Sequence, residues 1–252
     1  MATAVDLSII IPAYKEHRQI EPRLKALAEF LQTRDYGAVE VLVMAQSDDD
    51  TGAAARVEAK LFDRFRVINL GKRAGKGGAV RAGMFEAEGR YRLFMDADLA
   101  TPLVHLDEVW RIMESGGMVA IAVRSLGTIH KSYLRKIITV GGNLLAQVII
   151  LPGIKDTQCG FKAFRASAAT AIFGRQTILG WGFDMEILAI ARRLGYSIET
   201  FPADDWRDPK AEGLVGDSPV GAALQVFKDL LRIRLNLWAG RYRYRSYHYE
   251  AG

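Results

Sequence analysis

In the stretch Leu93-Phe-Met-Asp-Ala-Asp-Leu-Ala-Thr-Pro102, an apolar run ends in two aspartates separated by one alanine. The apolar residues 91–95 predict a buried strand. Side chains alternate along a strand, so Asp96 and Asp98 are expected on the same side of a still-extended strand end. Converging carboxylates repel one another unless a cation lies between them, and Mg²⁺ or Mn²⁺ prefers such oxygen ligands. The alternative is that Asp98 caps a helix beginning near Pro102 and that Asp96 is a solvated turn residue.

Strand and helix patterns alternate along the chain that precedes this stretch. Strands are expected at residues 7–12, 40–44 and 66–70, and helices at 20–31, at 53–62 and after the glycine-rich segment 71–83. This alternation predicts βαβ units and an α/β fold with a mostly parallel central sheet flanked by helices. Ligands of such folds bind beyond the carboxyl ends of the strands. Segments 12–16, 45–50, 72–78 and 96–98 all follow strand ends, so they should gather into a nucleotide site.

The second half of the chain has a less regular pattern. Strands are expected at 118–123 and 196–202, helices at 134–150, 183–194 and 227–238, and a polar turn at 156–162 that enters a short strand. Residues 211–219 are glycine-rich and polar, which indicates a mobile loop. No repeat or interdomain linker is visible. We therefore divide the chain into a main domain, residues 1–226, and a C-terminal amphipathic helix with a basic, aromatic tail, residues 227–252.

The composition is that of an ordinary globular protein. Of 252 residues, 50% are hydrophobic and 25% are charged. The single cysteine, Cys159, excludes an internal disulfide and agrees with a reducing compartment. No signal peptide and no run long enough to cross a bilayer is seen, so we expect a cytoplasmic protein. The net charge of +5 indicates an anionic partner: a nucleotide, a phospholipid surface or a nucleic acid.

Basic residues gather in two further places that suit phosphate. Lys72, Arg73, Lys76 and Arg81 lie among glycines, which let a backbone approach a ligand closely. The segment matches neither the Walker loop nor the dinucleotide fingerprint, and a basic helix start without a ligand is the alternative. The second cluster follows an expected strand end and is either a solvated face or a site for a second phosphate. It contains Arg124, His130, Lys131, Arg135 and Lys136.

Two carboxylates, Asp184 and Glu186, stand two residues apart near the start of an expected helix. There they favour the helix dipole. The functional alternative is that one of them is a general base for an acceptor hydroxyl.

The C-terminal tail interleaves basic and aromatic side chains. This composition suits a membrane surface, and also single-stranded nucleic acid or a disordered end. The other basic residues cluster near the expected nucleotide site and form no single long stripe, so we expect no nucleic-acid partner and favour contact with a membrane. The residues are Arg232, Arg234, Arg241, Arg243 and Arg245 with Trp238, Tyr242, Tyr244, Tyr247 and Tyr249.

Four motifs in order carry a resemblance to a known family. They are Ile9-Ile-Ile-Pro-Ala-Tyr-Lys-Glu16, Gly75-Lys-Gly-Gly-Ala-Val-Arg-Ala-Gly83, Met95-Asp-Ala-Asp-Leu-Ala-Thr-Pro102 and Asp156-Thr-Gln-Cys-Gly-Phe-Lys162. From about Leu7 to Leu235 the chain resembles family 2 glycosyltransferases. Within them it is most similar to the branch of dolichyl-phosphate β-glucosyltransferases and polyprenyl-phosphate mannosyltransferases. The resemblance implies a GT-A fold, a Rossmann-like arrangement, and a metal-dependent, inverting transfer of a hexose from a nucleotide sugar.

The resemblance also implies roles for individual residues. Asp96 and Asp98 would hold Mg²⁺ or Mn²⁺ on the donor diphosphate, and Arg124 would grip the lipid phosphate. A phosphate acceptor is already anionic and needs little general-base help, so Asp184 would position the sugar or the acceptor. Asp98, Asp184 and Arg124 are thus the expected catalytic residues. The remaining expected contacts are Pro12, Ala13, Tyr14, Glu16, Gln46, Lys76, Arg81 and Gln158 for the nucleotide or donor, and Lys131 and Arg135 for the acceptor phosphate.

The chain departs from the family pattern in two places. Family members usually carry Asp-Asp-Gly-Ser after the second strand, where this chain reads Ala45-Gln-Ser-Asp48. Gln46 offers both a donor and an acceptor to a base edge. The usual Gly-Ser-Arg at a later strand end is Ala122-Val-Arg124 here. We therefore expect an unusual donor preference.

Three hypotheses follow. The first is a glycosyltransferase, peripheral on the cytoplasmic face of a membrane, that moves glucose from UDP-glucose to a polyprenyl phosphate. The second is a soluble transferase that uses GDP-mannose or another donor on a sugar or small-molecule hydroxyl. The third is a non-catalytic protein that binds a nucleotide sugar, against which the intact Asp96 and Asp98 argue.

Overall fold

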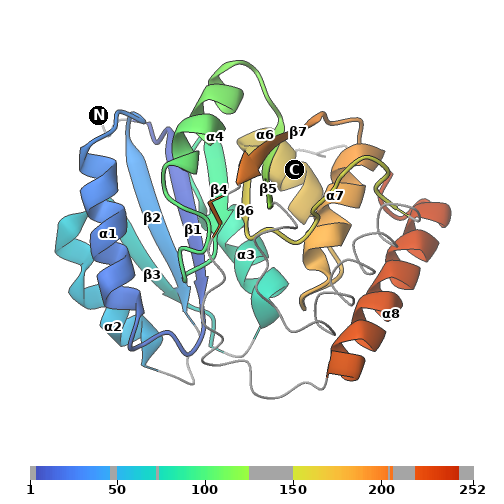
Figure 1. The fold of residues 1–252 in the computed structure, drawn as a ribbon, viewed down its shortest axis with the longest axis horizontal. Coiled ribbons are helices and arrows are strands. Elements are labelled where there is room, and N and C mark those ends of the chain that lie inside the picture. The colour runs from blue at the N-terminus through green and yellow to red at the C-terminus, as the bar shows by residue number, and fades with distance from the viewer. Residues whose placement is uncertain are drawn as a thin grey trace, which may run out of the picture.

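The structure is a computed structural model, and it describes residues 4–45, 50–71, 74–124, 150–203, 205–206 and 219–243. Helices cover both faces of one seven-stranded sheet (Figure 1). The elements are β1 (Leu7–Ala13), α1 (Ile20–Gln32), β2 (Val39–Ala45), α2 (Thr51–Val57), a 3₁₀ turn (Ala59–Leu61), β3 (Phe65–Asn69), α3 (Gly75–Glu86), β4 (Tyr91–Met95), α4 (His105–Glu114), β5 (Val119–Arg124), β6 (Phe161–Arg165), α6 (Ala166–Phe173), α7 (Phe183–Arg193), β7 (Ile198–Ala203) and α8 (Pro219–Trp238).

The strand order is β3-β2-β1-β4-β6-β5-β7, and the expectation of a mostly parallel sheet is confirmed with one exception. Strands β3, β2, β1 and β4 are parallel, as are β5 and β7, whereas β6 runs antiparallel to both of its neighbours. Because β4 and β6 are antiparallel, Met95 at the end of β4 pairs with Phe161 at the start of β6. This pairing brings the turn before β6 beside Asp96.

Two apolar clusters lie on opposite faces of the sheet, and alternation along the strands sorts side chains between them. Ile10 of β1 belongs to one cluster, while Ile9 and Ile11 belong to the other. The first cluster is closed by α3, α6, α7 and α8, and the second by α1, α2 and α4. A sheet covered on both faces favours strands that are apolar on both sides, and β1, β2 and β4 are mostly apolar, with Ser8, Glu40 and Arg92 as the exceptions.

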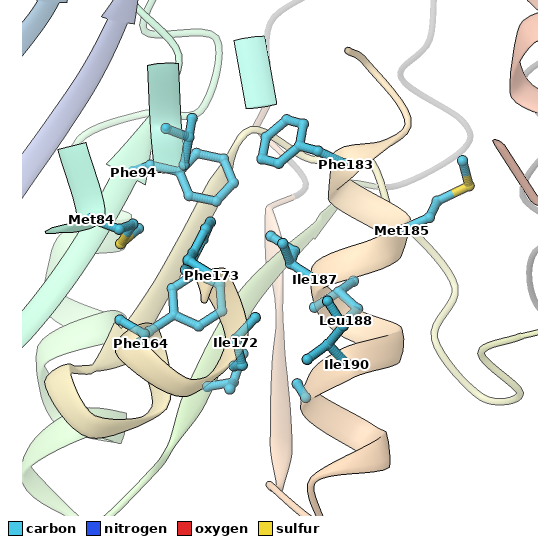
Figure 2. Packing of buried hydrophobic residues seen from close by; sticks show 14 of the residues in the cluster. Met84, Phe94, Phe164, Ile172, Phe173, Phe183, Met185, Ile187, Leu188 and Ile190 are labelled. Atoms are coloured by element: carbon cyan, nitrogen blue, oxygen red, sulfur yellow. The ribbon is translucent and has the colours of Figure 1, made fainter. Parts of the chain in front are cut away.

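Aromatic rings fill the first cluster at the point where α7 begins (Figure 2). Phe183, the first residue of α7, lies against Phe94 of β4 with 5.6 Å between ring centroids. Phe164 of β6 and Phe173 of α6 meet edge to face at 5.2 Å. This packing fixes the start of α7, and with it the position of Asp184.

The final helix begins earlier than its amphipathic pattern predicts. It starts at Pro219 and not at Phe227, so the expected boundary between residues 226 and 227 falls inside α8. Proline is tolerated in the first turn of a helix, where its missing N–H is not needed. Helix α6 was not expected, because it is apolar almost throughout and shows little periodicity. Most of the expected helix 134–150 and of the expected loop 211–219 lies outside the described residues.

No helix within the described part of the chain is both long and apolar enough to span a bilayer.

Candidate active site

Asp96 follows β4 directly and is held against the turn that precedes β6. Its backbone N–H donates to the carbonyl of Gly160 at 3.0 Å. A Cβ atom on Gly160 would lie 2.0 Å from Oδ2 of Asp96, so a larger residue there would displace the carboxylate. The Asp96 carboxylate therefore lies directly against the backbone of Gly160.

Asp98 lies in a turn, and the expectation of an extended strand end that includes it is wrong. The strand stops at Met95, and Leu99 adopts a left-handed φ of 53°. Oδ1 of Asp98 accepts the N–H of Ala100 at 3.0 Å, an Asx turn that competes with strand pairing. Helix α4 begins at His105, so Asp98 does not cap it.

The carboxylates of Asp96 and Asp98 nevertheless interact electrostatically. Burial raises the pKa of Asp98 above its ordinary value, and the charge of Asp96 raises it further. Glu16, beyond β1, is affected in the same way: burial raises its pKa most, and Asp98 and Asp96 add to the increase against the opposing effect of Arg23. We call Glu16, Asp96 and Asp98 the acidic corner.

Glu16 is positioned by neighbours from two elements. Its Oε2 accepts Nη1 of Arg23 at 2.7 Å, and its backbone N–H donates to Oγ1 of Thr51 at 2.9 Å. Lys15, just before it, has a left-handed φ of 59°. The chain thus turns sharply after β1 and places Glu16 at the same edge of the sheet as Asp96.

Lys76 enters the acidic corner from the start of α3. Its Nζ lies 2.6 Å from Oδ1 of Asp96, and it also lies over the ring of Trp181, 5.2 Å from the centroid. The structure therefore brings Lys76 together with Asp96, as the expected phosphate site requires. Its role in binding a donor stays a prediction.

The glycines at the start of α3 make room for protein, not only for a ligand. A Cβ on Gly75, whose φ is 71°, would lie 2.4 Å from the carbonyl oxygen of Leu179. A Cβ on Gly77 would lie 2.6 Å from Cβ of Phe183. The backbone N–H of Gly78 donates to Leu179 O at 3.2 Å. These close approaches place the segment before α7, including Trp181, beside Lys76.

Asp184 forms a buried ion pair behind the acidic corner. Nζ of Lys162 donates to Oδ1 of Asp184 and, at 2.5 Å, to the carbonyl of Cys159. Both side chains are almost completely buried. Burial raises the pKa of Asp184, although Lys162 and Lys76 oppose the increase. A covered, paired carboxylate suits a positioning role better than proton abstraction.

Glu186, the other carboxylate considered as a base, is used in hydrogen bonds that hold the structure together. Oε1 of Glu186 accepts hydrogen bonds from Oγ1 of Thr177 and the hydroxyl of Tyr242, both at 2.6 Å. Its Oε2 accepts the backbone N–H groups of Thr177 and Ile178 at 2.9 and 2.7 Å. Glu186 thereby ties the chain after α8 to the start of α7.

Arg124 is engaged by the turn that precedes β6. Its Nε and Nη2 donate to the two carboxylate oxygens of Asp156 at 2.6 and 2.9 Å, and its guanidinium lies 5.1 Å from the ring centroid of Trp206. Burial alone would raise the pKa of Asp156, but the hydrogen bonds and charge of Arg124 outweigh it and lower the pKa. Gln158 joins the same turn, donating its backbone N–H to Asp156 at 3.1 Å.

The other expected site residues fall into three groups. Pro12, Ala13 and Tyr14 lie at the end of β1, next to the corner, although the Ala13 side chain is buried in the second cluster and would offer its backbone. Arg81 lies on the α6 side of α3, where its Nε donates to the carbonyl of Phe173 at 3.0 Å, so the structure does not bring it to the acidic corner. Gln46, Lys72, Arg73, Lys131 and Arg135 lie outside the described residues.

With this geometry in place, comparison with known proteins decides the family. Residues 8–173 match the family described as Glycosyl transferase family 2. The chain belongs to this family. The resemblance seen in the four sequence motifs is thereby confirmed.

Three curated relatives of this family 2 glycosyltransferase carry the name dolichyl-phosphate beta-glucosyltransferase. The human dolichyl-phosphate beta-glucosyltransferase is 32% identical over 254 residues, covering 94% of this chain and 77% of the human protein. The enzyme of the same name from Saccharomyces cerevisiae is 32% identical over 261 residues, covering 94% and 76%. That from Dictyostelium discoideum is 31% identical over 256 residues, covering 95% and 77%.

Solved structures establish the fold. Mannosyl-3-phosphoglycerate synthase from Rubrobacter xylanophilus superposes with a TM-score of 0.67 at 14% identity, covering 94% of this chain and 76% of that one. Glucosyl-3-phosphoglycerate synthase from Mycobacterium tuberculosis gives 0.64 at 19% identity, covering 91% and 80%. PcManGT from Pyrobaculum calidifontis, in complex with GDP-Man and Mn²⁺, gives 0.54 at 16% identity, covering 97% and 77%. The fold is GT-A, as expected, and the chain is a glycosyltransferase.

The acidic corner fits a divalent cation only with help from a substrate. No group of three or more His, Cys, Asp or Glu side chains is arranged to hold a metal among the residues that the structure describes. Asp96 and Asp98 offer two carboxylates. Mg²⁺ is typically held by one or two carboxylates together with substrate phosphates. The residues present therefore fit a metal that shares its coordination with a nucleotide diphosphate.

Sequence reasoning missed four residues that build this site. Lys162, within the apolar strand Phe161–Arg165, and Trp181, between two glycines, both break local patterns and could have been noticed. Asp156 was quoted within a motif but given no role. Trp206, which contacts Arg124, has no sequence signal, because this contact arises from folding alone.

Proposed function

We propose that this glycosyltransferase moves glucose from UDP-glucose to a polyprenyl phosphate such as dolichyl phosphate, with inversion at the anomeric carbon. The observation that carries the proposal is the acidic corner at the carboxyl ends of β1 and β4, with Lys76 beside it. Relatives named dolichyl-phosphate beta-glucosyltransferase, about one third identical over nearly the whole chain, supply the substrate class.

We infer a direct displacement, because a phosphate acceptor needs no general base. An acceptor phosphate oxygen, already anionic, attacks the anomeric carbon from the face opposite the departing nucleoside diphosphate. Asp96 and Asp98 would hold Mg²⁺ or Mn²⁺, which neutralises charge on the leaving diphosphate. Lys76, whose Nζ lies 2.6 Å from Oδ1 of Asp96, would bind a diphosphate oxygen. Asp184, fixed by Lys162, would position the sugar, and no side chain needs to remove a proton.

Two groups are proposed to hold the acceptor phosphate. The Arg124 guanidinium lies at the end of β5 and keeps N–H groups beyond those used by Asp156. Lys131 and Arg135 are assigned from the family resemblance. GDP-mannose is the second donor, since the unusual Gln46 leaves base recognition without the family's aspartate.

The action at a membrane surface is proposed from the outer face of α8. Leu224, Phe227, Leu231, Leu235 and Trp238 recur at helical spacing and are all exposed, Leu235 by 60% and Trp238 by 88%. We call these five residues the outer stripe. Leu230 and Ile233, on the opposite side of the helix, are fully buried in the first cluster. α8 therefore has two apolar faces, one packed against the protein and one, the outer stripe, exposed to contact with another apolar environment such as lipid.

Charge indicates what this phase is. A shallow groove of about 440 Å³ runs along α8, with Leu231 and Leu235 as its apolar part and Lys228, Arg232 and Arg241 as its basic part. Anionic lipid headgroups above acyl chains complement this arrangement. α8 lies at the end of the molecule opposite α1 and α2 (Figure 1). The expectation that Tyr242 belongs to the membrane-facing set is wrong, because its side chain is buried against Glu186.

The experiment is a transfer assay with labelled UDP-glucose or GDP-mannose and a short-chain polyprenyl phosphate in detergent. We expect label from UDP-glucose in the organic phase, dependent on Mg²⁺ or Mn²⁺ and abolished by a chelator. Transfer of label from GDP-mannose and not from UDP-glucose would show that GDP-mannose is the donor. Transfer only to a soluble sugar or small-molecule hydroxyl would contradict the lipid acceptor and favour the second hypothesis.

A further inference from the structure

We infer that Lys76 is a built-in counter-cation of the acidic corner, which it leaves when a divalent cation and a nucleotide diphosphate arrive. Its ammonium group balances Asp96 in the donor-free protein and moves to a donor phosphate in the complex. The inference rests on the proposed metal-dependent donor site. It assigns Lys76 two successive partners, and so makes the cation site weak until the nucleotide is present.

Lys76 and Asp96 form a close ion pair. Nζ of Lys76 and Oδ1 of Asp96 are 2.6 Å apart, a short charge-assisted hydrogen bond. Asp96 is backed by Gly160, where even a Cβ atom would clash with the carboxylate. The carboxylate thus lies against the Gly160 backbone on one side and holds the ammonium group of Lys76 on Oδ1. A divalent cation that binds this same oxygen must displace Lys76.

The position of Lys76 in α3 is unfavourable for a cation. It is the second residue of α3, where the positive end of the helix dipole disfavours a cation. The first turn of α3 contains no acidic residue. A lysine at this position is stabilised by anions from elsewhere in the fold, here Asp96. Phosphate oxygens at a helix N-terminus would replace that stabilisation once the donor is bound.

The Lys76 side chain is less buried than that of Lys162 and lies at the edge of the site. Side-chain exposure is 13% for Lys76 and 0% for Lys162. Lys162 is bound to Asp184 and to the carbonyl of Cys159 inside the sheet, which makes it a permanent structural cation. Lys76 has the flexible stem of a lysine at the site's edge and lies over the exposed ring of Trp181, which offers a cation a second favourable contact.

The consequence is a coupled order of binding. In the donor-free protein a divalent cation must break the Lys76–Asp96 pair, and the released ammonium group keeps only its contact with the ring of Trp181. With a diphosphate present, the released ammonium gains a phosphate oxygen, and the metal gains further oxygen ligands. The metal therefore binds tightly only when the nucleotide is present, and the nucleotide binds tightly only when the metal is present. As a result, the site does not hold a metal without its donor.

The experiment measures Mn²⁺ binding from the spectrum of free Mn²⁺, without and with UDP, for the wild type, Lys76→Met and Lys76→Arg. Without UDP we expect Lys76→Met to bind Mn²⁺ roughly tenfold more tightly than the wild type, the size of a partly buried ion pair. Lys76→Arg keeps the charge and should stay close to the wild type. With UDP present, Lys76→Met should lose its advantage and bind UDP more weakly than the wild type.

Lys25→Met is the matched control, because Lys25 forms an ion pair of the same 2.6 Å length with Glu21 on the exposed face of α1. It should leave every Mn²⁺ and UDP affinity unchanged. Thermal unfolding with and without Mn²⁺ checks that each variant folds, and Mn²⁺ alone should raise the melting temperature of Lys76→Met more than that of the wild type.

Equal Mn²⁺ affinity of Lys76→Met and the wild type without UDP, with normal binding when UDP is present, would overturn the exchange and leave the metal site intact. If neither protein bound Mn²⁺ even with UDP, the proposed metal-dependent donor site would be wrong, and the exchange with it.

Discussion

Asp98 is the residue whose substitution separates catalysis from folding. Its carboxylate makes a local Asx turn with Ala100, so replacing it with asparagine keeps a similar hydrogen bond. We expect Asp98→Asn to change the free energy of unfolding by less than about 1 kcal/mol. Turnover should fall about 100-fold or more, because charge neutralisation at the leaving diphosphate is worth several kcal/mol. Initial rates at saturating Mn²⁺ check this. Asp63→Asn, at an exposed position, should match the wild type.

The ion pair of Lys162 and Asp184, in contrast, is expected to contribute mainly to folding stability. Lys162→Met leaves the Asp184 carboxylate buried without its partner, which should cost about 3–5 kcal/mol in unfolding free energy. The double variant Lys162→Met with Asp184→Asn removes both charges and should recover much of that loss. Urea unfolding measures the three values. Equal losses for the single and double variants would show that Lys162 stabilises the protein by something other than this pair.

At the scale of the element, α8 carries the proposed contact with lipid. Leu231→Glu places a charge in the middle of the outer stripe, beside the basic groove, and leaves the buried face of the helix untouched. Binding to anionic liposomes should fall about tenfold, since burial of one leucine is worth roughly 1.5–3 kcal/mol. Cosedimentation measures it. Val104→Glu, at an exposed apolar position just before α4, is the control and should have no effect. Undiminished binding by Leu231→Glu would remove the outer stripe from the account.

The elements also show how far the sequence leads. Alternating strands and helices in the first half predict β1, β2, β3 and β4 correctly, because each strand is a short apolar run bounded by turn residues. The antiparallel direction of β6 is not visible, since no local pattern records which neighbour a strand will pair with. The ion pair between Lys162 and Asp184, 22 residues apart, likewise exists only after β6 and α7 pack together.

The same limit applies to the acidic corner. The spacing of Asp96 and Asp98 predicts two neighbouring carboxylates on an extended strand, but the strand ends at Met95 and Asp98 lies in a turn that continues through the left-handed Leu99. The glycines around Lys76 predict a close backbone approach, and the structure shows that Gly75 and Gly77 are approached by the protein's own chain. Residue types were thus easier to predict than the partner that each one meets.

For the whole molecule, the Arg124–Asp156 pair makes stability depend on pH. The pKa of Asp156 is lowered below 3.8 in the folded protein by the hydrogen bonds and charge of Arg124, which outweigh burial. Its contribution is therefore complete above that value and is lost as the pH falls through the lower, folded pKa. Asp156→Asn should cost about 3 kcal/mol at pH 7. The difference from the wild type should shrink as the pH is lowered below 3.8, as measured by urea unfolding at each pH. A difference that stays constant with pH would contradict the ionic character of the pair.

Calorimetric titration of UDP-glucose into the wild type and Asp98→Asn, each with and without Mn²⁺, tests whether the acidic corner is the metal and donor site. The account predicts binding to the wild type that is at least about tenfold tighter with Mn²⁺, and no such gain for Asp98→Asn. Equal binding with and without the metal, or an unchanged gain in Asp98→Asn, would contradict the assignment of the acidic corner as the metal and donor site.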